Sequence, residues 1–117
     1  MHFCWCTLYV SDMEKSLDFY QNCIGLPLAQ RFHSGDKDIA FLGSGETQVE
    51  LICAPNEPVT QREGISLGFI TDSLEDTLQA FREKGLETEG PFQPGPHTRF
   101  FYTRDPDGQK IQLVQNL

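Results

Sequence analysis

Basic residues are scarce in this chain. It has 9 Lys and Arg against 17 Asp and Glu, which gives a formal net charge of −8 at pH 7. Binding to the phosphate backbone of a nucleic acid requires a basic surface, and attraction to an anionic membrane requires the same. The sequence therefore predicts neither a nucleic acid nor a membrane as partner.

Long apolar runs and paired cysteines are also missing. No stretch approaches the roughly 20 apolar residues of a membrane span, and residues 1–10 lack the basic start of a secretion signal. We therefore expect a cytoplasmic protein, in which cysteines are small buried apolar residues rather than disulfide partners. The cysteines, none of them in a CxxC pair, are Cys4, Cys6, Cys23 and Cys53.

The remaining composition is that of one soluble domain. The 117 residues are 38% hydrophobic and 22% charged, which is ordinary for a globular protein of this size. We predict a single domain over residues 1–117, and the question becomes how it is organised internally.

The first half of the chain reads as a strand, a helix and three more strands. The helix begins after Ser11 or Asp12, and its apolar residues, spaced +4, +3 and +4, form one stripe. This stripe consists of Met13, Leu17, Tyr20 and Ile24. The expected strands are 4–10, 28–33, 39–42 and 48–53.

The second half repeats this order. A strand at 65–70 precedes a helix with the apolar stripe Leu74, Leu78 and Phe81, which Gly85 ends. The remaining strands are expected at 86–89, 99–103 and 110–115, with a turn at Pro91–Pro96.

The halves align with an offset of about 60 residues, which pairs Asp12 with Asp72 and Glu50 with Gln112. We place repeat 1 at about 1–54, a linker at about 55–64 and repeat 2 at about 65–117. The predicted fold class is α+β, with two βαβββ repeats that form a curved mixed sheet around a cavity and helices outside.

Three stretches carry a resemblance to a known family. LYVSDMEKSLDFYQNCIGLPL, QVELI and FYTRDPDGQKIQLV resemble segments of the vicinal-oxygen-chelate superfamily, which includes glyoxalases, bleomycin-resistance proteins and extradiol dioxygenases. The resemblance covers nearly the whole chain. It implies the fold predicted above and a homodimer, whereas the activity stays open because this fold hosts unrelated chemistries.

Metal-dependent members of this superfamily hold the metal with four inward-facing side chains in the pattern His/Glu/His/Glu. The resemblance aligns those positions with Trp5, Glu50, Ser66 and Gln112. Trp5 offers only an indole N–H and Ser66 is a poor ligand. We therefore expect no cofactor and no metal; a divalent metal, if bound, would use Glu50 and Gln112.

A second resemblance concerns possible catalysis. The segment from Gly95 to Gly108 is similar to the part of extradiol dioxygenases in which a histidine and a tyrosine flank the metal. Carried over, His97 is the candidate acid/base and Tyr102 the hydrogen-bond donor. The spacing between them is shorter here than in that family, so a loop histidine near a packed tyrosine is the alternative.

Strand alternation predicts which side chains join these positions. The expected ligand-binding set is Trp5, Thr7, Tyr9, Glu50, Ser66, Gly68, Tyr102 and Gln112. A carboxylate in such an aromatic pocket needs a partner, for which the indole of Trp5, Gln112 and Tyr102 are the candidate donors. Glu50 then either holds a cationic or hydrogen-bonding ligand, or acts as a general base.

Three functions follow from these readings. The first is a glyoxalase/bleomycin-resistance-like protein that binds a small organic molecule in an aromatic cavity without the usual metal. The second is a divalent-metal-dependent lyase, like lactoylglutathione lyase, or a dioxygenase, with Glu50, His97 and Tyr102 as catalytic residues. The third is a non-catalytic interaction domain whose cavity is filled by its own side chains.

Overall fold

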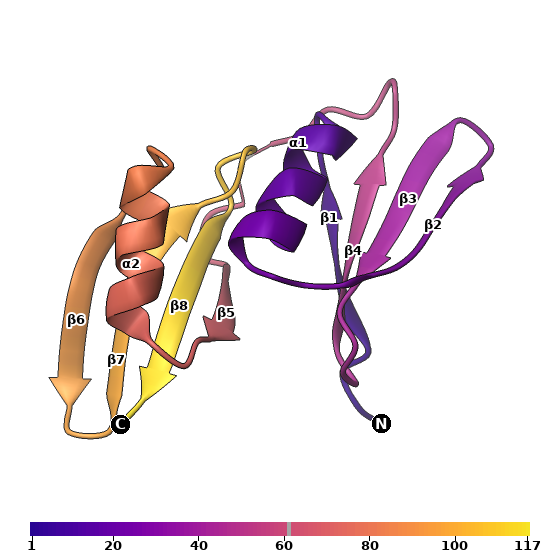
Figure 1. The fold of residues 1–117 in the computed structure, drawn as a ribbon. Helices are drawn as coiled ribbons and strands as arrows, with labels where there is room; N and C mark the ends of the chain where they lie inside the picture. Colours follow the sequence, from indigo (N-terminus) through magenta and orange to yellow (C-terminus); the bar gives the residue numbers. More distant parts are fainter. Residues whose placement is uncertain (61) are drawn as a thin grey trace. The chain divides into compact units, whose positions relative to one another are not determined.

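A computed structural model describes residues 1–60 and 62–117 of the chain. The chain divides into two compact units, Met1–Thr60 and Gln61–Leu117, each with one four-stranded sheet and one helical segment (Figure 1). The division falls inside the segment 55–64 that was predicted as the linker. Among the described residues, no helix is long and apolar enough to cross a membrane.

Unit 1 is a mixed sheet with a helical segment between its first two strands. Its elements are β1 (Trp5–Tyr9), α1 (Met13–Leu17), the π-helix η1 (Asp18–Cys23), β2 (Leu28–Ser34), β3 (Lys37–Leu42) and β4 (Gln48–Cys53). The strand order is β1-β4-β3-β2, with β1 parallel to β4 and the other neighbours antiparallel.

Unit 2 has the same topology. Its elements are β5 (Ser66–Ile70), α2 (Leu74–Glu83), β6 (Glu89–Gly95), β7 (Thr98–Arg104) and β8 (Lys110–Asn116). The strand order is β5-β8-β7-β6, again with the first strand parallel to its neighbour. The predicted α+β class and the repeated βαβββ pattern are confirmed.

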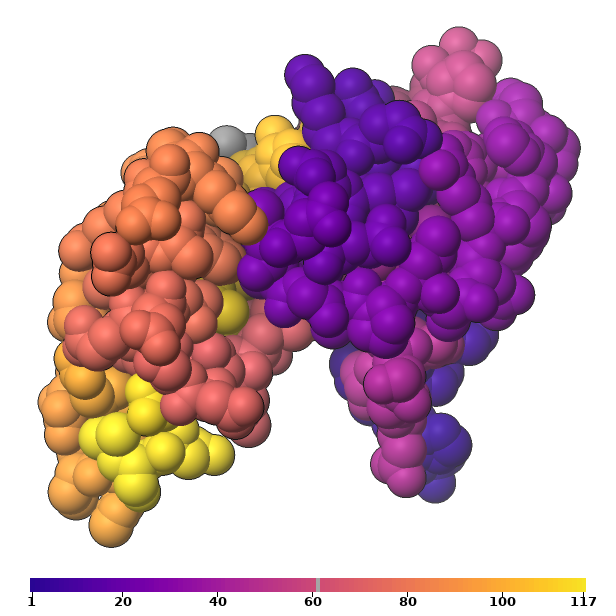
Figure 2. All heavy atoms as spheres, viewed as in Figure 1, coloured from indigo at the N-terminus to yellow at the C-terminus, as the bar shows by residue number. Residues whose placement is uncertain are grey.

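One face of each sheet is buried under its helix. Strand side chains alternate between two faces, and in unit 1 the buried set on the helix side is Leu8, Val10, Ala40, Leu42, Val49 and Leu51. In unit 2, Phe81 of α2 meets Phe101 of β7 edge to face, with ring centroids 5.6 Å apart. Figure 2 shows this side of unit 2, where the side chains of α2 cover much of the sheet.

Both helices begin at polar caps. The side chain of Asp12 accepts a hydrogen bond from the backbone N–H of Lys15, and Ser73 accepts one from Asp76. Such caps satisfy N–H groups that have no partner within the helix. The caps lie 61 residues apart, so Ser73 rather than Asp72 corresponds to Asp12.

The first helix departs from the predicted stripe. After Leu17 it becomes a π-helix, and the N–H of Ile24 bonds to the carbonyl of Phe19 at 3.0 Å, five residues back. This change turns Phe19 into the core beside Tyr20, with 3% and 0% of their surfaces exposed. Ile24, the last residue of the predicted stripe, is half-buried at the end of the helix.

The second strand of unit 2 was also misplaced. The sequence predicted a strand at 86–89 followed by a turn at Pro91–Pro96, whereas β6 spans Glu89–Gly95. Prolines normally argue against a strand, but β6 is at the edge of its sheet and its pairing with β7 shifts register twice. An edge strand tolerates Pro91 and Pro94 because their missing N–H groups are not needed for pairing.

The cysteines are less buried than expected. All 4 are free; Cys4 is exposed, and the other three are half-buried. The thiol of Cys53 lies 3.8 Å from the carbonyl oxygen of Ser11. The prediction of buried cysteines was therefore wrong, whereas a role as disulfide partners has no support among the described residues.

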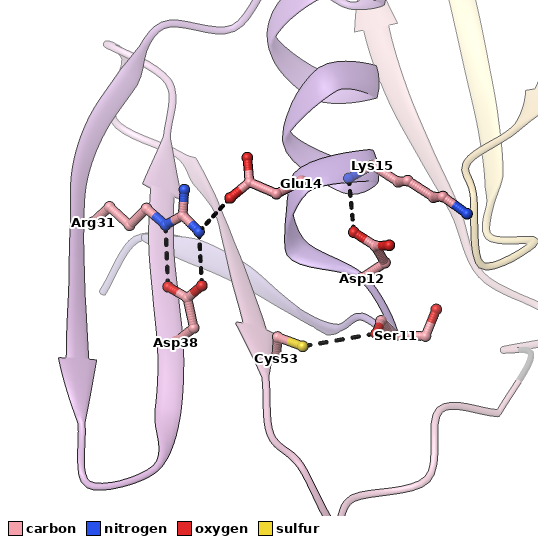
Figure 3. Close-up of polar contacts among 7 residues, drawn as sticks. All are labelled: Ser11, Asp12, Glu14, Lys15, Arg31, Asp38 and Cys53. Carbon is pink, nitrogen blue, oxygen red and sulfur yellow. Dashed lines mark hydrogen bonds and ion pairs between the residues drawn. The ribbon is translucent and has the colours of Figure 1, made fainter.

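An ion-pair network that the sequence did not reveal ties α1 to the β2–β3 hairpin (Figure 3). The guanidinium of Arg31 donates through Nε and Nη2 to the two carboxylate oxygens of Asp38, at 3.1 and 2.8 Å. The same Nη2 lies 2.7 Å from Glu14 of α1. These hydrogen bonds raise the pKa of Arg31 and hold the pKa of Asp38 below its ordinary value.

Replacing Arg31 with Gln should lower the free energy of unfolding near neutral pH by about 1 kcal/mol, because both pairs are partly exposed and screened by water. The pKa of Asp38 is depressed in the folded state, so its contribution is complete above its ordinary pKa of 3.8. That contribution is lost as the pH falls through the folded value. Urea unfolding should show the difference between the two proteins shrinking below that pH.

Arg99→Gln is the matched control. Arg99 pairs with Glu75 of α2 at 2.8 Å, and within the described residues no second carboxylate comparable to Asp38 pairs with it. Arg99→Gln should therefore lower the free energy of unfolding by less than Arg31→Gln does. Equal losses at neutral pH would contradict the weight given to the Arg31–Asp38 pair.

Candidate functional site

The face of each sheet opposite the helix carries the residues predicted for the site, and we call it the open face. In unit 1, every second residue of β1 lies on this face, namely Trp5, Thr7 and Tyr9. Thr7 is in register with Glu50 on β4. Phe41 of β3 is opposite Glu50 on the other side. The unit 1 members of the predicted set therefore share one face.

Aromatic rings cover the centre of the open face of unit 1. Trp5 meets Phe41 edge to face, with centroids 5.3 Å apart, and Phe32 of β2 stacks on Phe41 at 6.3 Å. Trp5 and Phe32 stay 47% and 41% exposed, whereas Phe41 is 8% exposed. Phe41 is thus the floor of an apolar patch that Ile39, Ile52 and Tyr9 extend.

Glu50 finds its hydrogen-bond partner within β1. The hydroxyl of Thr7 donates to Oε1 of Glu50 at 2.5 Å. The sequence had suggested Trp5, Gln112 or Tyr102 as the donor and had not considered Thr7 for this role. The register makes the contact local, because Thr7 and Glu50 face each other across two paired parallel strands.

The open face of unit 2 holds the other members of the predicted set. Gly68 of β5 is in register with Gln112 of β8, and Gln112 is in register with Tyr102 of β7. A Cβ placed on Gly68 would lie 3.7 Å from Oε1 of Gln112, so this glycine leaves the amide accessible. Ser66 is exposed near the start of β5, two residues before Gly68.

A second aromatic cluster covers this face. Phe92, Phe100 and Tyr102 contact one another with centroid separations of 5.3 to 6.1 Å. The ammonium of Lys110 lies 3.9 Å from the centroid of the Tyr102 ring. This distance is that of a cation–π interaction, so unit 2 supplies its own cation to its aromatic cluster.

His97 and Tyr102 are well separated within unit 2. His97 is exposed in the turn before β7, and Tyr102 is five residues farther along. A strand advances about 3.3 Å per residue, which separates the two by roughly 16 Å. The carbonyl of His97 accepts a hydrogen bond from the N–H of Leu117 at 2.8 Å, which is a structural contact.

The four aligned positions do not fit a metal. Trp5 has no lone pair to donate, and the hydroxyl of Ser66 is a weak ligand. Glu50 and Gln112 leave two oxygen donors, one in each unit, and Thr7 already engages one oxygen of Glu50. In the described part of the chain, no three His, Cys, Asp or Glu side chains gather in a way that could hold a metal ion.

A polar depression of about 990 Å³ lies at the β7–β8 turn of unit 2. Its lining includes Ser66 and Lys110, together with charged groups of the turn such as Arg104 and Asp105. The carboxylate of Asp105 accepts from the backbone N–H groups of Asp107 and Gln109, at 2.9 and 2.8 Å. These bonds shape the turn, and the lining has none of the aromatic character expected of the ligand pocket.

Several residues of the open faces escaped the sequence analysis. In unit 1 these residues are Phe41 and Phe32. In unit 2 they include Phe100 and Lys110, which could have been found from their parity with Tyr102 and Gln112. Phe92 could not have been found, because it lay in a segment expected to be a turn.

Comparison with known proteins places this geometry in context. A family model described as the glyoxalase/bleomycin resistance protein/dioxygenase superfamily matches residues 2–113. A lactoylglutathione lyase of Neisseria meningitidis serogroup A is 34% identical over 119 residues, which cover 92% of this chain and 86% of that protein.

Solved structures give the same picture. An antibiotic binding protein from Streptomyces, TnmS3, matches with a TM-score of 0.81 and 25% identity, over 100% of this chain and 97% of that chain. The trypanothione-dependent glyoxalase I of Leishmania major has a TM-score of 0.85 at 18% identity, over 98% and 86%. At 18% identity, the likeness to the Leishmania major protein shows the fold alone.

Replacing Lys110 with Gln should lower the free energy of unfolding by about 0.5 kcal/mol, because the cation over the exposed part of Tyr102 is lost. Lys110→Arg should retain most of the stability, since a guanidinium also interacts with an aromatic face. Urea unfolding of the three proteins measures both effects. A loss in the Arg variant as large as in the Gln variant would contradict a cation–π role.

Proposed function

The chain belongs to the glyoxalase/bleomycin resistance protein/dioxygenase superfamily, and on that premise we propose that it binds a small aromatic organic molecule without the usual metal site. The observation that carries this proposal is the composition of the open faces, where aromatic rings surround a few polar groups. Small-molecule sites have this character.

The open face of unit 1 supports the proposal most directly. Trp5 is half-exposed beside the nearly buried Phe41, so a planar ligand could cover the indole while Glu50 offers one polar contact. In unit 2 the corresponding polar contact would come from Gln112, beside the aromatic cluster of Tyr102. By their places on these faces, Thr7 and Tyr9 would line a ligand on unit 1, and Ser66 and Gly68 would line one on unit 2.

The likeness to a protein described as antibiotic binding supports binding rather than turnover. In such a role the protein needs affinity and an apolar surface but no catalytic acid or base. This is consistent with the separation of His97 from Tyr102 within unit 2. A cytoplasmic location and a homodimer remain predictions of this proposal.

A metal-dependent lyase is the second candidate, and the relatives named lactoylglutathione lyase favour it. A metal in this chain would have Glu50 and Gln112 as its oxygen donors and would supply Lewis-acid chemistry. Glu50 would then be the general base. The donor set argues against this candidate, since Trp5 and Ser66 replace the two histidines of the family pattern.

Binding of 2-naphthol, a neutral aromatic probe, should be saturable and unchanged after treatment with EDTA. The chain has 1 Trp, so Trp5 fluorescence and its single indole N–H NMR signal report directly on the open face of unit 1. Trp5→Ala should weaken binding by about 10-fold, because the large contact area of the indole is lost; the variant is followed through other amide signals.

Elemental analysis and an assay for lactoylglutathione formation decide between the two candidates. Purified protein should contain less than stoichiometric nickel, zinc, iron or manganese and should show no lyase activity when these ions are added. One metal ion per chain together with activity that EDTA abolishes would overturn the proposal in favour of the lyase.

A further inference from the structure

We propose that the open face of unit 1 selects organic cations, with an ammonium group held at Glu50 and the apolar part of the ligand on Trp5 and Phe41. This inference rests on the proposed function and names the chemical class of ligand for one of its two faces. It follows from a difference in charge between two faces that otherwise have the same topology.

The two open faces differ in charge at equivalent strand positions. Thr7 of β1 faces Glu50, just as Gly68 of β5 faces Gln112, so the carboxylate of unit 1 corresponds to a neutral amide in unit 2. Two residues earlier, Gln48 of β4 corresponds to Lys110 of β8. At these positions β4 of unit 1 therefore carries a carboxylate, whereas β8 of unit 2 carries an ammonium group.

The carboxylate of Glu50 is held in place and only partly satisfied. Thr7 donates to its Oε1, and among the described side chains no Lys or Arg forms an ion pair with it. Glu50 is half-buried, and within the described residues its second oxygen has no hydrogen-bond partner. A half-buried carboxylate next to apolar rings favours a cationic partner.

The aromatic rings next to Glu50 favour the same partner. Trp5 and Phe41 meet at 5.3 Å with an interplanar angle of 78°, which leaves part of the indole exposed. In unit 2 a protein cation already covers the ring of Tyr102. Within the described residues no Lys or Arg is placed over Trp5 or Phe41, so that position is open to a cation from the ligand.

Lys37 is the nearest basic residue by strand position, and it does not fill this role. It shares a face with Ile39 and Phe41 but lies at the start of β3. Four residues of strand separate it from Phe41, which corresponds to about 13 Å. The position next to Glu50 and the rings therefore remains available to a ligand. Aromatic rings combined with a carboxylate recognise alkyl- and arylammonium groups.

Three probes of similar size test the charge preference: benzyltrimethylammonium, benzyl alcohol and benzoate. Each is titrated into the full chain while the indole N–H signal of Trp5 is followed by NMR, which suits weak binding. The cation should bind about 10-fold more tightly than the alcohol, because Coulomb attraction adds to ring contact. Benzoate should bind most weakly, and added salt should weaken only the binding of the cation.

Glu50→Gln is the decisive variant, because it keeps the shape of the side chain and removes its charge. It should abolish the preference for the cation, so that benzyltrimethylammonium and benzyl alcohol bind to this variant with similar affinity. Glu46→Gln makes the same change of net charge on an exposed loop of unit 1 and should leave the preference intact. Dispersed amide signals show that each variant is folded.

The outcomes separate this inference from the proposed function. If all three probes shift the Trp5 signal with equal affinity, or if Glu50→Gln retains the preference, the cation selectivity is wrong and the aromatic binding site stands. If none of the probes, 2-naphthol included, shifts the signal, both fail. A preference lost in both glutamine variants would also overturn the inference, because net charge alone would then explain it.

Discussion

Each four-stranded sheet buries one face under a single helical segment, and the period-two alternation of its strands then dictates what the opposite face presents. Leu8 and Leu51 lie under α1, so their strand neighbours Thr7 and Glu50 must lie on the other side. A register slip of one residue would exchange the two sets. The composition of each open face is therefore a consequence of core packing.

The helices are fixed on their sheets by related polar contacts as well as by apolar packing. Glu14 near the start of α1 pairs with Arg31, and Glu75 near the start of α2 pairs with Arg99. These contacts lie on the helix side of each sheet. Among the described residues, neither Glu50 nor Lys110 on the open faces takes part in these ion pairs.

The two halves differ chemically on their open faces. On the helix side Leu51 and Leu113 are buried apolar residues at equivalent positions, because the cores must stay filled. The open-face positions differ in charge and size, with Glu50 against Gln112 and Thr7 against Gly68. One topology thus carries two chemically distinct surfaces, neither of which has the donor set of the family's metal site.

The sequence by itself determined the βαβββ repeat and the parity of Trp5, Thr7, Glu50 and Gln112, because these depend on local periodicity and turn residues. The family followed from the resemblance of three sequence stretches. Only the tertiary structure decided the partner of Glu50, the cation over Tyr102 and the extent of β6. Those features depend on which strands become neighbours. Prolines are tolerated in β6 because it lies at an edge, and Thr7 reaches Glu50 because β1 pairs with β4.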